Sequence, residues 1–355
     1  MVPGAKVAVV GGGINGIMTA LTLSKAGCLV DLYDKGMLGA ETSAKSSKLL
    51  HGGLRYLETL QLRLVYEGLR CRAKWVEKFP QYTKAVTFYV PIYRGDARSK
   101  WFVFAGAKLY QLLAGLRSLG ASHLVSCSQM CERFPDLRRD GLLGGVSYAD
   151  VIMDDQSIIA ALRDELLDQG VAIHENSCVQ IKDTKGVLVT ECGEIQYSYV
   201  VNATGPWAGA TIGSFDKLQY VRGSHLLISP IVADDALVLT SREDRRIIFL
   251  LPFGELNIFG TTEVLQNSPD NEGVSEAEVQ YLTRQFGEYF QGLSLNIQGA
   301  YSGVRPIYDD NEQFSAASRD CVIEKDERTV TIFGGKWTSS LEIGEKVLRI
   351  IRTEL

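Results

Sequence analysis

A short run of glycines and polar side chains, Ser46–Glu58, carries the residue types best suited to chemistry. It contains His51, Arg55 and Tyr56 around a pair of glycines. An imidazole exchanges protons near neutral pH, a guanidinium binds anions through paired N–H donors, and a phenol donates a hydrogen bond. Glycines let the backbone approach a flat ligand closely. This combination predicts a loop that lies against a planar cofactor and reaches toward an anionic substrate.

A second glycine-rich turn, upstream of this run, has the spacing of a dinucleotide-binding site. Gly11, Gly13 and Gly16 follow a predicted strand over residues 6–10 and open a predicted helix. Such glycines form the tight turn and bring backbone N–H groups to a pyrophosphate at the helix N-terminus. Asp34 ends the next predicted strand, where a carboxylate accepts hydrogen bonds from ribose hydroxyls. Because strand, turn, helix and acid occur in order, the sequence predicts a bound dinucleotide.

The fingerprint alone does not choose between NAD and FAD, but two later turns favour FAD. Residues 203–205 end a predicted strand and can lie against the dinucleotide, and residues 334–336 open the last predicted helix. A helix N-terminus with Lys336 beside it suits the negative charge of a reduced flavin. We therefore predict FAD as the cofactor. The expected contacts are Gly11, Gly13, Ile14, Asn15, Gly16, Asp34, Lys35, Thr42, Ser43, Ser46, Ser47, Lys48, Leu49, His51, Gly52, Cys178, Ala203, Thr204, Gly205, Trp207, Gly334, Gly335, Lys336, Trp337 and Thr338.

Composition and charge exclude several other classes of protein. The chain has 355 residues, 46% of them hydrophobic, which is enough for two structural units. A net charge of −5 is unlike a nucleic-acid-binding protein, which is usually basic. Seven cysteines without a CxxC pair favour reduced thiols and a cytoplasmic location, and the four histidines lack metal-ligand spacing. We expect no metal site, no signal peptide and no spanning segment at the N-terminus.

The pattern of predicted elements changes along the chain. Strands and helices alternate near the start, middle and end, whereas strand-like runs dominate between about 220 and 307. The expected strands are 6–10, 29–34, 86–93, 171–174, 187–190, 199–203, 224–229, 247–252, 257–261, 299–304 and 329–333, and the expected helices are 14–26, 62–78, 98–119, 157–169, 275–289 and 339–352. The predicted fold class is α/β: a discontinuous, Rossmann-like FAD-binding domain (1–85, 146–215 and 320–355) and an α+β substrate-cap domain on an antiparallel sheet (86–145 and 216–319).

Several longer motifs together resemble one family. They are SSKLLHGGLRYLE (46–58), VNATGPWA (201–208), RGSH (222–225), FGTTE (259–263), YSGVRPIYDD (301–310), SRD (318–320) and FGGKWTS (333–339). In this order they are similar to the FAD-dependent glycerol-3-phosphate dehydrogenases, within the larger group of D-amino-acid-oxidase-like flavoproteins. The resemblance spans nearly the whole chain and implies the FAD domain and antiparallel cap described above.

The resemblance also implies a reaction. It is the oxidation of glycerol 3-phosphate to dihydroxyacetone phosphate by hydride transfer to flavin N5, with electrons passed to a quinone, to oxygen or to a protein. Two departures matter. The bacterial and mitochondrial dehydrogenases continue with a helical C-terminal domain, whereas this sequence ends at Leu355, so we expect a short form. Trp337 also stands where a leucine is more usual, close enough to the flavin to alter the pocket.

The candidate catalytic groups follow from what this chemistry needs. A phosphate requires a cationic cluster, for which Arg305, Arg319 and Arg55 are the candidates, and Tyr56 can hydrogen-bond the substrate. Lys336 lies beside the flavin. His225 is the preferred general base because a histidine pKa suits proton uptake near neutrality. The alternatives are His51 as the base or as a flavin contact, a core role for His225, and an ion pair of Arg305 with Asp309 or Asp310.

Other readings of the whole chain stay open. An amine or amino-acid oxidase of the same fold would need a carboxylate clamp instead of a phosphate site. A flavin-binding protein without turnover, or a relative acting on a modified glycerol phosphate, also fits. The apolar segment 101–116 has basic neighbours and fits either a peripheral membrane contact or a buried cap helix. We favour burial, because the chain is acidic overall.

Overall fold

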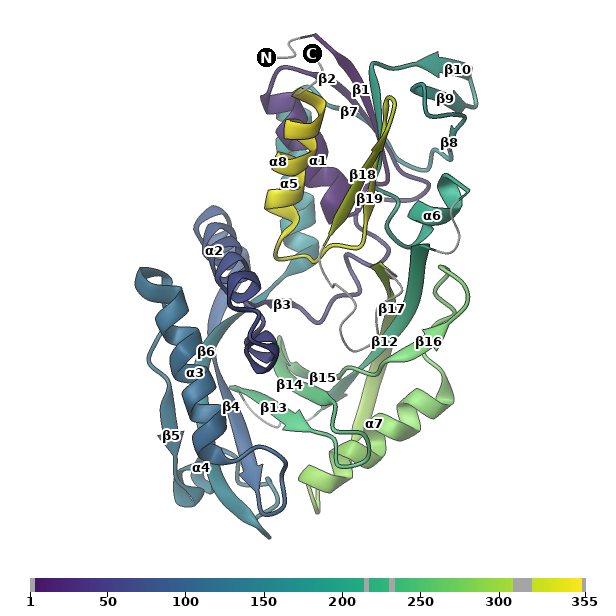
Figure 1. Ribbon diagram of the computed structural model, residues 1–355. Helices are drawn as coiled ribbons and strands as arrows, with labels where there is room; N and C mark the ends of the chain where they lie inside the picture. The colour runs from purple at the N-terminus through teal and green to yellow at the C-terminus, as the bar shows by residue number, and fades with distance from the viewer. Residues whose placement is uncertain (1–3, 214–216, 230–233, 309–320, 353–355) are drawn as a thin grey trace.

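The protein, seen in a computed structural model, has a cofactor domain above a larger cap (Figure 1). The structure describes residues 4–213, 217–229, 234–308 and 321–352. Strands from the start, the middle and the end of the chain meet in the upper domain, and both termini lie at its far end (Figure 1). The discontinuous α/β arrangement expected from the sequence is confirmed.

The cofactor domain is built on a mainly parallel sheet. Its strands are, in spatial order, β18 (Val322–Asp326), β19 (Thr329–Phe333), β11 (Tyr199–Asn202), β1 (Lys6–Val10), β2 (Leu29–Tyr33) and β7 (Ala172–His174). Helices α1 (Ile14–Lys25), α5 (Asp155–Asp168) and α8 (Ser340–Arg352) cover one face, and a small antiparallel sheet of β8 (Gln180–Ile181), β9 (Val187–Thr190) and β10 (Gly193–Gln196) covers the other.

The alternation of side chains in β1 explains why both faces are covered. Val7 and Val9 are fully buried against the helices, and Ala8 and Val10 point the opposite way into the cluster that holds Leu188 of the small sheet. A strand that is apolar at every position needs a partner on both faces, because its side chains alternate between them.

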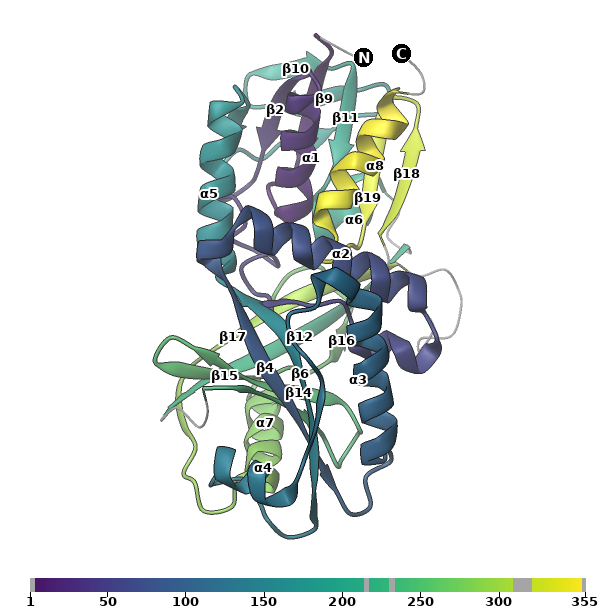
Figure 2. The same cartoon turned by 90° about the vertical axis from the view of Figure 1, so that its left-hand side faces the viewer.

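The cap contains a larger sheet with helices on both sides. Its strands are β3 (Leu49–Leu50), β4 (Thr83–Tyr93), β5 (His123–Val125), β6 (Leu142–Met153), β12 (Leu218–Ser229), β13 (Ala236–Thr240), β14 (Ile247–Phe253), β15 (Leu256–Gly260), β16 (Val264–Gln266) and β17 (Asn296–Tyr308). Helices α2 (Leu62–Lys78) and α3 (Lys100–Ala114) pack on one face, and α4 (Cys127–Arg133) and α7 (Glu276–Tyr289) on the other (Figures 1 and 2). The short α6 (Ala208–Thr211) follows β11.

Helix α2 runs across the junction of the two domains (Figure 2). Its Trp75 is fully buried, stacks on Phe79 and contacts the ring of Trp337 at 4.9 Å. The Trp75 indole also donates to the Thr338 carbonyl at 3.1 Å. Trp337, which we expect to border the flavin, packs on the Trp75 ring, and its indole donates to the Ser43 carbonyl at 3.1 Å.

Several element predictions need correction. Strand 187–190 is β9, which lies in the cofactor domain as expected and pairs with β8 and β10 in the small covering sheet. The expected domain boundary at residue 146 falls inside β6, which pairs with β4 in the cap sheet. Strands β6, β13 and β18 were not predicted. Glycines interrupt the apolar pattern of β6, and charged residues interrupt that of β18, whereas β13 is a short apolar run without either. It also extended the helix at 98–119 beyond α3, which is followed by Gly115 with a φ of 53°.

Burial of the apolar helix in the cap was the favoured reading, and it is wrong for one face of α3. Ala107, Tyr110 and Ala114 are buried, whereas Trp101 and Leu112 are 67% and 75% exposed. The helix is apolar nearly all round, and the sheet can cover only the side that faces it. Within the part of the chain that the structure describes, no helix has the length and apolar character needed to cross a membrane.

Candidate active site

The turn after β1 forms a nucleotide cradle, which we define as residues 11–16 together with Asp34 and the turn 334–335. A Cβ added at Gly11, whose φ is +105°, would stand 2.4 Å from the Ala203 carbonyl oxygen. A Cβ at Gly16 would stand 1.8 Å from the Gly11 oxygen. Glycine is therefore required at both positions, because backbone segments meet there without room for a side chain.

Asp34 is held in a fixed orientation at the end of β2. Its carboxylate accepts hydrogen bonds from the backbone N–H of Gly12 at 2.6 Å and of Gly36 at 2.7 Å. Each carboxylate oxygen retains a further lone pair for a ribose hydroxyl. The Asp34 carbonyl accepts from the N–H of Ser177, which brings the exposed Cys178 next to this end of the cradle.

The two other predicted turns border the same cradle. Asn15 donates to the Gly334 carbonyl at 3.1 Å, and its Oδ1 is buried with no hydrogen-bond partner among the described residues. Ser43 accepts from the Ile14 N–H at 2.9 Å. On the far side the Lys35 ammonium lies 3.5 Å from the centre of the Trp207 ring. The predicted contacts from three distant stretches of sequence thus meet around the N-terminus of α1.

The first part of the loop 46–58 is tied to a buried acid. Lys48 Nζ lies 2.6 Å from Asp155, and both side chains are buried. Ser46 also donates to Asp155, at 2.7 Å. Burial raises the pKa of Asp155, and the Lys48 charge opposes that rise. Lys48 and Ser46 were predicted as cofactor contacts, and in the structure their side chains anchor the loop to the first turn of α5. Thr42 likewise donates to the Val304 carbonyl.

Strands β12 and β17 present a substrate face, which we define as His225, Tyr301 and Arg305. The strands are antiparallel, with His225 opposite Tyr301 and Val221 opposite Arg305, so the three side chains share one side. The rings of His225 and Tyr301 stack with their centres 4.8 Å apart. The loop closes over this pair, since His225 Nε2 lies 2.9 Å from Ser47 Oγ and Tyr301 donates to the Ser46 carbonyl at 3.0 Å.

His225 is a neutral imidazole in this setting. Burial, followed by the charges of Arg305 and Lys48, lowers its pKa to about 3. The expectation of an ordinary histidine pKa is wrong, because the His225 side chain is 3% exposed and lies near Arg305 and Lys48. Its Nδ1 is buried and has no hydrogen-bond partner in the described part of the chain.

The Arg305 guanidinium lies on the cap sheet against Gly223, Thr262 and Glu263. Its Nη2 donates to the Thr262 carbonyl at 3.1 Å, and its Nη1 lies 3.6 Å from Glu263. A Cβ at Gly223 would stand 2.4 Å from Arg305 Nη2, so the guanidinium lies flat over that glycine. Asp309 and Asp310, the expected alternative partners, lie outside the described residues. The fork is thus held in place by a carbonyl oxygen and a partly exposed carboxylate.

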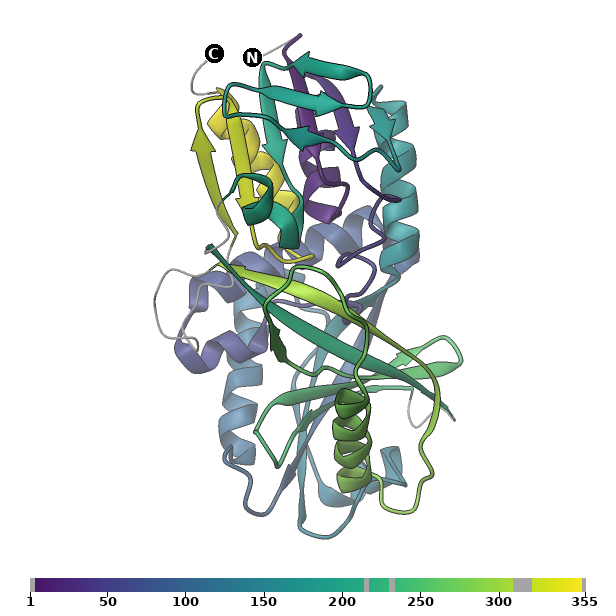
Figure 3. The same cartoon turned by 90° about the vertical axis from the view of Figure 1, so that its right-hand side faces the viewer.

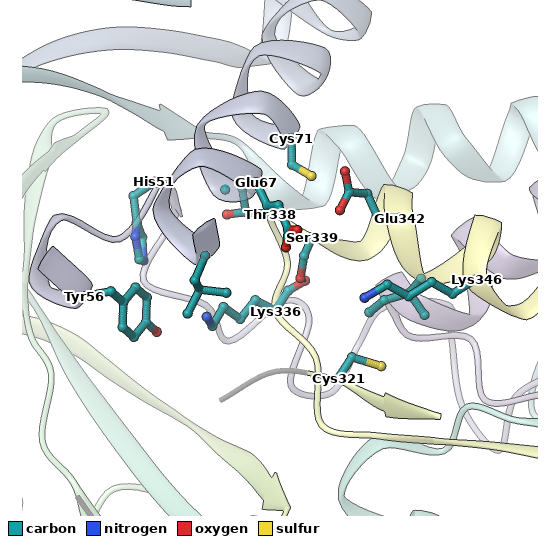
Figure 4. Close-up of a pocket in the computed structure, with 14 residues that line it drawn as sticks. His51, Tyr56, Glu67, Cys71, Cys321, Lys336, Thr338, Ser339, Glu342 and Lys346 are labelled. Atoms are coloured by element: carbon teal, nitrogen blue, oxygen red, sulfur yellow. The ribbon is translucent and has the colours of Figure 1, made fainter. Parts of the chain in front are cut away.

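The second part of the loop borders a cavity (Figure 4). His51, Gly52 and Tyr56 line it from the loop, and Lys336 enters from the turn before α8. Lys336 Nζ lies 4.3 Å from the centre of the Tyr56 ring, in a cation–π contact. The structure therefore brings together four of the predicted residues, with Thr338 also in the wall of the cavity.

A buried network that the sequence analysis missed supports this part of the loop. The Gly52 N–H donates to the Tyr110 hydroxyl at 2.7 Å, and that hydroxyl donates to Asp150 at 2.8 Å. Arg72 completes the network with a hydrogen bond of 2.9 Å to the same carboxylate. No local sequence signal marks this set, because its members come from α2, α3 and β6.

Two of the predicted arginines, Arg55 and Arg319, are not placed in the nucleotide cradle, the substrate face or the cavity. Arg55 is exposed on the 3-10 turn Leu54–Thr59 and makes no hydrogen bond or ion pair with any residue that the structure describes. Arg319 lies outside the described residues. Of the predicted phosphate-binding arginines, Arg305 is the one that the structure places beside His225.

A parallel sheet with a glycine cradle, joined to a cap that presents a neutral histidine and an arginine, defines a two-domain dinucleotide-dependent oxidoreductase. Residues 6–347 match the DAO family, described as FAD dependent oxidoreductase, and the chain belongs to this family. The cradle fits FAD, because the glycines leave room for a pyrophosphate and Asn15 Oδ1 is buried without a partner among the described residues. Asp34, the N-terminus of α1 and the turn 334–336 would hold the cofactor.

Relatives with assigned activities cover most of the chain. A glycerol-3-phosphate dehydrogenase of Pseudomonas aeruginosa is 31% identical over 96% of this chain and 70% of its own length. A D-erythritol 1-phosphate dehydrogenase of Brucella abortus is 30% identical over 95% of this chain and 72% of its own. The solved glycerol-3-phosphate dehydrogenase of Bacillus halodurans, complexed with FAD, superposes with a TM-score of 0.78 at 21% identity. That match covers 99% of this chain and 65% of the solved one.

Proposed function

We propose that this protein oxidises the secondary alcohol of a small polyol phosphate, glycerol 3-phosphate first of all, to the ketone. The observation that carries the proposal is the pairing of a neutral, buried imidazole with an arginine fork on one side of the β12–β17 pair. Relatives that act on glycerol 3-phosphate and D-erythritol 1-phosphate support the same chemistry.

Each group then has one task. Arg305 binds the phosphate through its fork, and Lys336 and Tyr56 border the substrate from the loop side. His225 takes the hydroxyl proton as the C–H hydride leaves. Bound FAD supplies the acceptor for that hydride. His51 lines the cavity beside Lys336 and is assigned to contact the cofactor, with His225 preferred as the base because it lies beside Arg305.

The substrate itself adjusts the base. Arg305 is the largest charge effect that lowers the His225 pKa, and a phosphate dianion beside Arg305 offsets that charge. In the tautomer whose Nε2–H donates to Ser47 Oγ, Nδ1 is the nitrogen left to accept the proton. A base that gains strength when the anionic substrate binds is consistent with a requirement for the phosphate group.

Anaerobic stopped-flow absorbance tests the proposal. FAD-loaded protein is mixed with glycerol 3-phosphate or D-erythritol 1-phosphate, with glycerol, erythritol and glycine as controls. We expect rapid bleaching of the oxidised flavin with at least one phosphate ester and none with its parent polyol. Bleaching by glycine instead would select the amine-oxidase alternative, and no bleaching by any compound would select a flavin-binding protein without turnover.

We also propose that the exposed side of α3 makes a peripheral contact with a membrane, near a quinone that accepts the electrons. Trp101, Phe102 and Leu112 are exposed along the helix with Lys108 among them, and Leu116 is exposed in the turn that follows it. Amphipathic aromatic and basic side chains suit an anionic lipid surface. Co-sedimentation with phosphatidylglycerol vesicles tests this: Leu112→Glu should abolish binding, whereas Leu167→Glu, at an exposed leucine of α5, should not. Equal binding of both variants would contradict the proposal.

A further inference from the structure

The substrate face has a second, hidden side. In β12, His225 and Gly223 point toward the loop and Arg305, whereas Arg222 and Ser224 point the opposite way, as alternation in a strand requires. Helix α7 lies against that opposite side, seen as the green helix below the crossed strands in Figure 3. Its Glu278 is 3% exposed. A buried carboxylate therefore lies directly behind the proposed substrate site.

Glu278 holds two segments of the site together. Its Oε1 accepts hydrogen bonds from Ser224 Oγ and from Thr262 Oγ1, each at 2.7 Å. Thr262 Oγ1 in turn accepts from the Ser224 N–H at 2.8 Å. Ser224 precedes His225, and Thr262 lies in the segment that follows β15. One carboxylate oxygen thus links the strand that carries His225 to that segment through two side-chain hydrogen bonds.

The same segment holds Arg305. The Thr262 carbonyl accepts from Arg305 Nη2 at 3.1 Å, and the Cβ position of Gly223 is closed by the same guanidinium. Thr262 alone therefore connects Glu278 to the Arg305 guanidinium. Its hydroxyl donates to the Glu278 carboxylate, and its carbonyl accepts from Arg305. Because hydrogen bonds join Glu278, Thr262 and Arg305 in series, we expect a shift at Glu278 to move the fork.

We infer that Glu278 is a positioning residue that sets Arg305, and with it the phosphate of the substrate, relative to His225. The inference rests on the proposed function, and it concerns a residue that touches neither substrate nor cofactor.

The negative charge of Glu278 strengthens the hydrogen bonds that it accepts from Ser224 and Thr262. Burial alone would raise the pKa of Glu278, but hydrogen bonds from Ser224, Thr262 and Ser275 more than offset this and lower the pKa to about 2. Arg222 pairs with the other oxygen at 2.9 Å. Oε1 thus receives two short hydroxyl hydrogen bonds while Oε2 is held by a cation. A carboxylate is an acceptor only, so its geometry admits no alternative donor arrangement.

Glu278 also caps the N-terminus of α7, and this structural role can be separated experimentally from the positioning of Arg305. Glu278 occupies the N3 position of a capping box, in which Ser275 accepts from the Glu278 N–H and Glu278 accepts from the Ser275 N–H at 3.1 Å. Glutamine serves the same position in a capping box. Glu278→Gln therefore keeps the helix start and removes the charge that orders Ser224 and Thr262. Glu276→Gln, at an exposed acid of the same turn, is the matched control.

The experiment measures KM and kcat for glycerol 3-phosphate in FAD-loaded protein, and the binding of inorganic phosphate by calorimetry. In Glu278→Gln we expect KM and the phosphate Kd to rise roughly tenfold, as for loss of one charge-assisted hydrogen bond, with kcat within about threefold of the parent. Glu276→Gln should match the parent. In an Arg305→Ala background, Glu278→Gln should add little, because both act on the same fork.

The outcomes separate two failures. A folded Glu278→Gln protein with unchanged KM and phosphate Kd would overturn the positioning role. If the parent binds phosphate but does not bleach with any polyol phosphate, the proposed function fails, and the phosphate Kd still tests Glu278. If Glu278→Gln does not fold, Thr262→Val removes the same contact and keeps the carbonyl. It should then reproduce the rise in phosphate Kd, and an unchanged value would contradict the role.

Discussion

The nucleotide cradle and the substrate face are built by different means. In the cradle the chain meets itself backbone to backbone, and a Cβ at Gly11 or Gly16 has no space. On the substrate face side chains hold one another, with Glu278, Thr262 and Arg305 forming a hydrogen-bonded series. Where backbone segments touch in the cradle, any added side chain forces them apart. On the substrate face, one side-chain contact can be lost while the others remain. Substitutions should therefore act on the cradle as an all-or-none loss and on the face as graded changes.

The largest effect is expected from Gly11→Ala. The added Cβ would stand 2.4 Å from the Ala203 oxygen and needs a φ of +105°, so β1 and β11 must separate at the cradle. We expect purified protein that retains no FAD, measured by visible absorbance. Gly170→Ala is the control, since Gly170 has a φ of +74° and open space around its Cβ. It should cost about 1 kcal/mol of stability and keep FAD. Full FAD retention by Gly11→Ala would break the comparison.

Arg305→Ala should come next, with a graded loss. Removal of the fork that we assign to the phosphate should raise KM for glycerol 3-phosphate about 100-fold while FAD content stays that of the parent. Arg305→Lys should fall between, because an ammonium keeps the charge and loses the paired geometry. Arg284→Ala, at an exposed arginine of α7 that lies near Glu243, is the control and should leave KM unchanged. A loss of FAD together with the rise in KM would show that the two regions are not independent.

The low pKa of His225 predicts a pH dependence of stability. The folded pKa is about 3 and the unfolded value is 6.5, so the unfolded state binds the additional proton between these values. Stability is fully present above pH 6.5 and falls as the pH drops toward 3. At pH 5 the loss is about 2 kcal/mol, measured by urea unfolding of the parent against His225→Gln. The exposed His123→Gln serves as the reference substitution. Parallel pH curves for the parent and His225→Gln would refute the buried, neutral state.

The comparison also explains which parts of the structure could be read from the sequence. Most of the cradle is coded locally, since Gly11, Gly16 and Asp34 follow one another within one βαβ unit and could be named from their spacing, whereas the turn 334–335 comes from the far end of the chain. The substrate face could be named by residue type, as His225 and Arg305 were, but not by environment. The His225 pKa depends on burial and on Lys48, which lies far away in the sequence. The sequence separation of these residues does not indicate that they are neighbours, so the low pKa of His225 is visible only in the folded structure.

Glu278 and strand β6 were also not predicted, because the neighbours that explain them are distant in the sequence. Glu278 reads in the sequence as an ordinary capping-box acid, and nothing local relates it to Ser224 or Thr262. Strand β6 was missed because its two glycines interrupt the apolar pattern, although Gly144 and Gly145 are needed where Val125 and Val90 approach. In both cases the physical reason for the residue is a neighbour supplied by another part of the chain.

Tyr110→Phe tests the smallest expected effect, in the buried network that supports the second part of the loop 46–58. The Tyr110 hydroxyl joins Gly52 of the loop to the buried Asp150, which also pairs with Arg72. Phenylalanine keeps the packing and leaves the Gly52 N–H without its acceptor, which should cost about 1–3 kcal/mol. We expect a lower melting temperature and a severalfold slower bleaching rate, with KM for glycerol 3-phosphate unchanged, because the network supports the cavity side of the loop. Tyr66→Phe, at an exposed tyrosine of α2, should alter neither quantity. If Tyr110→Phe instead raised KM as Arg305→Ala does, the loop and the Arg305 guanidinium would be one coupled unit, and the graded picture of the substrate face would have to include α3.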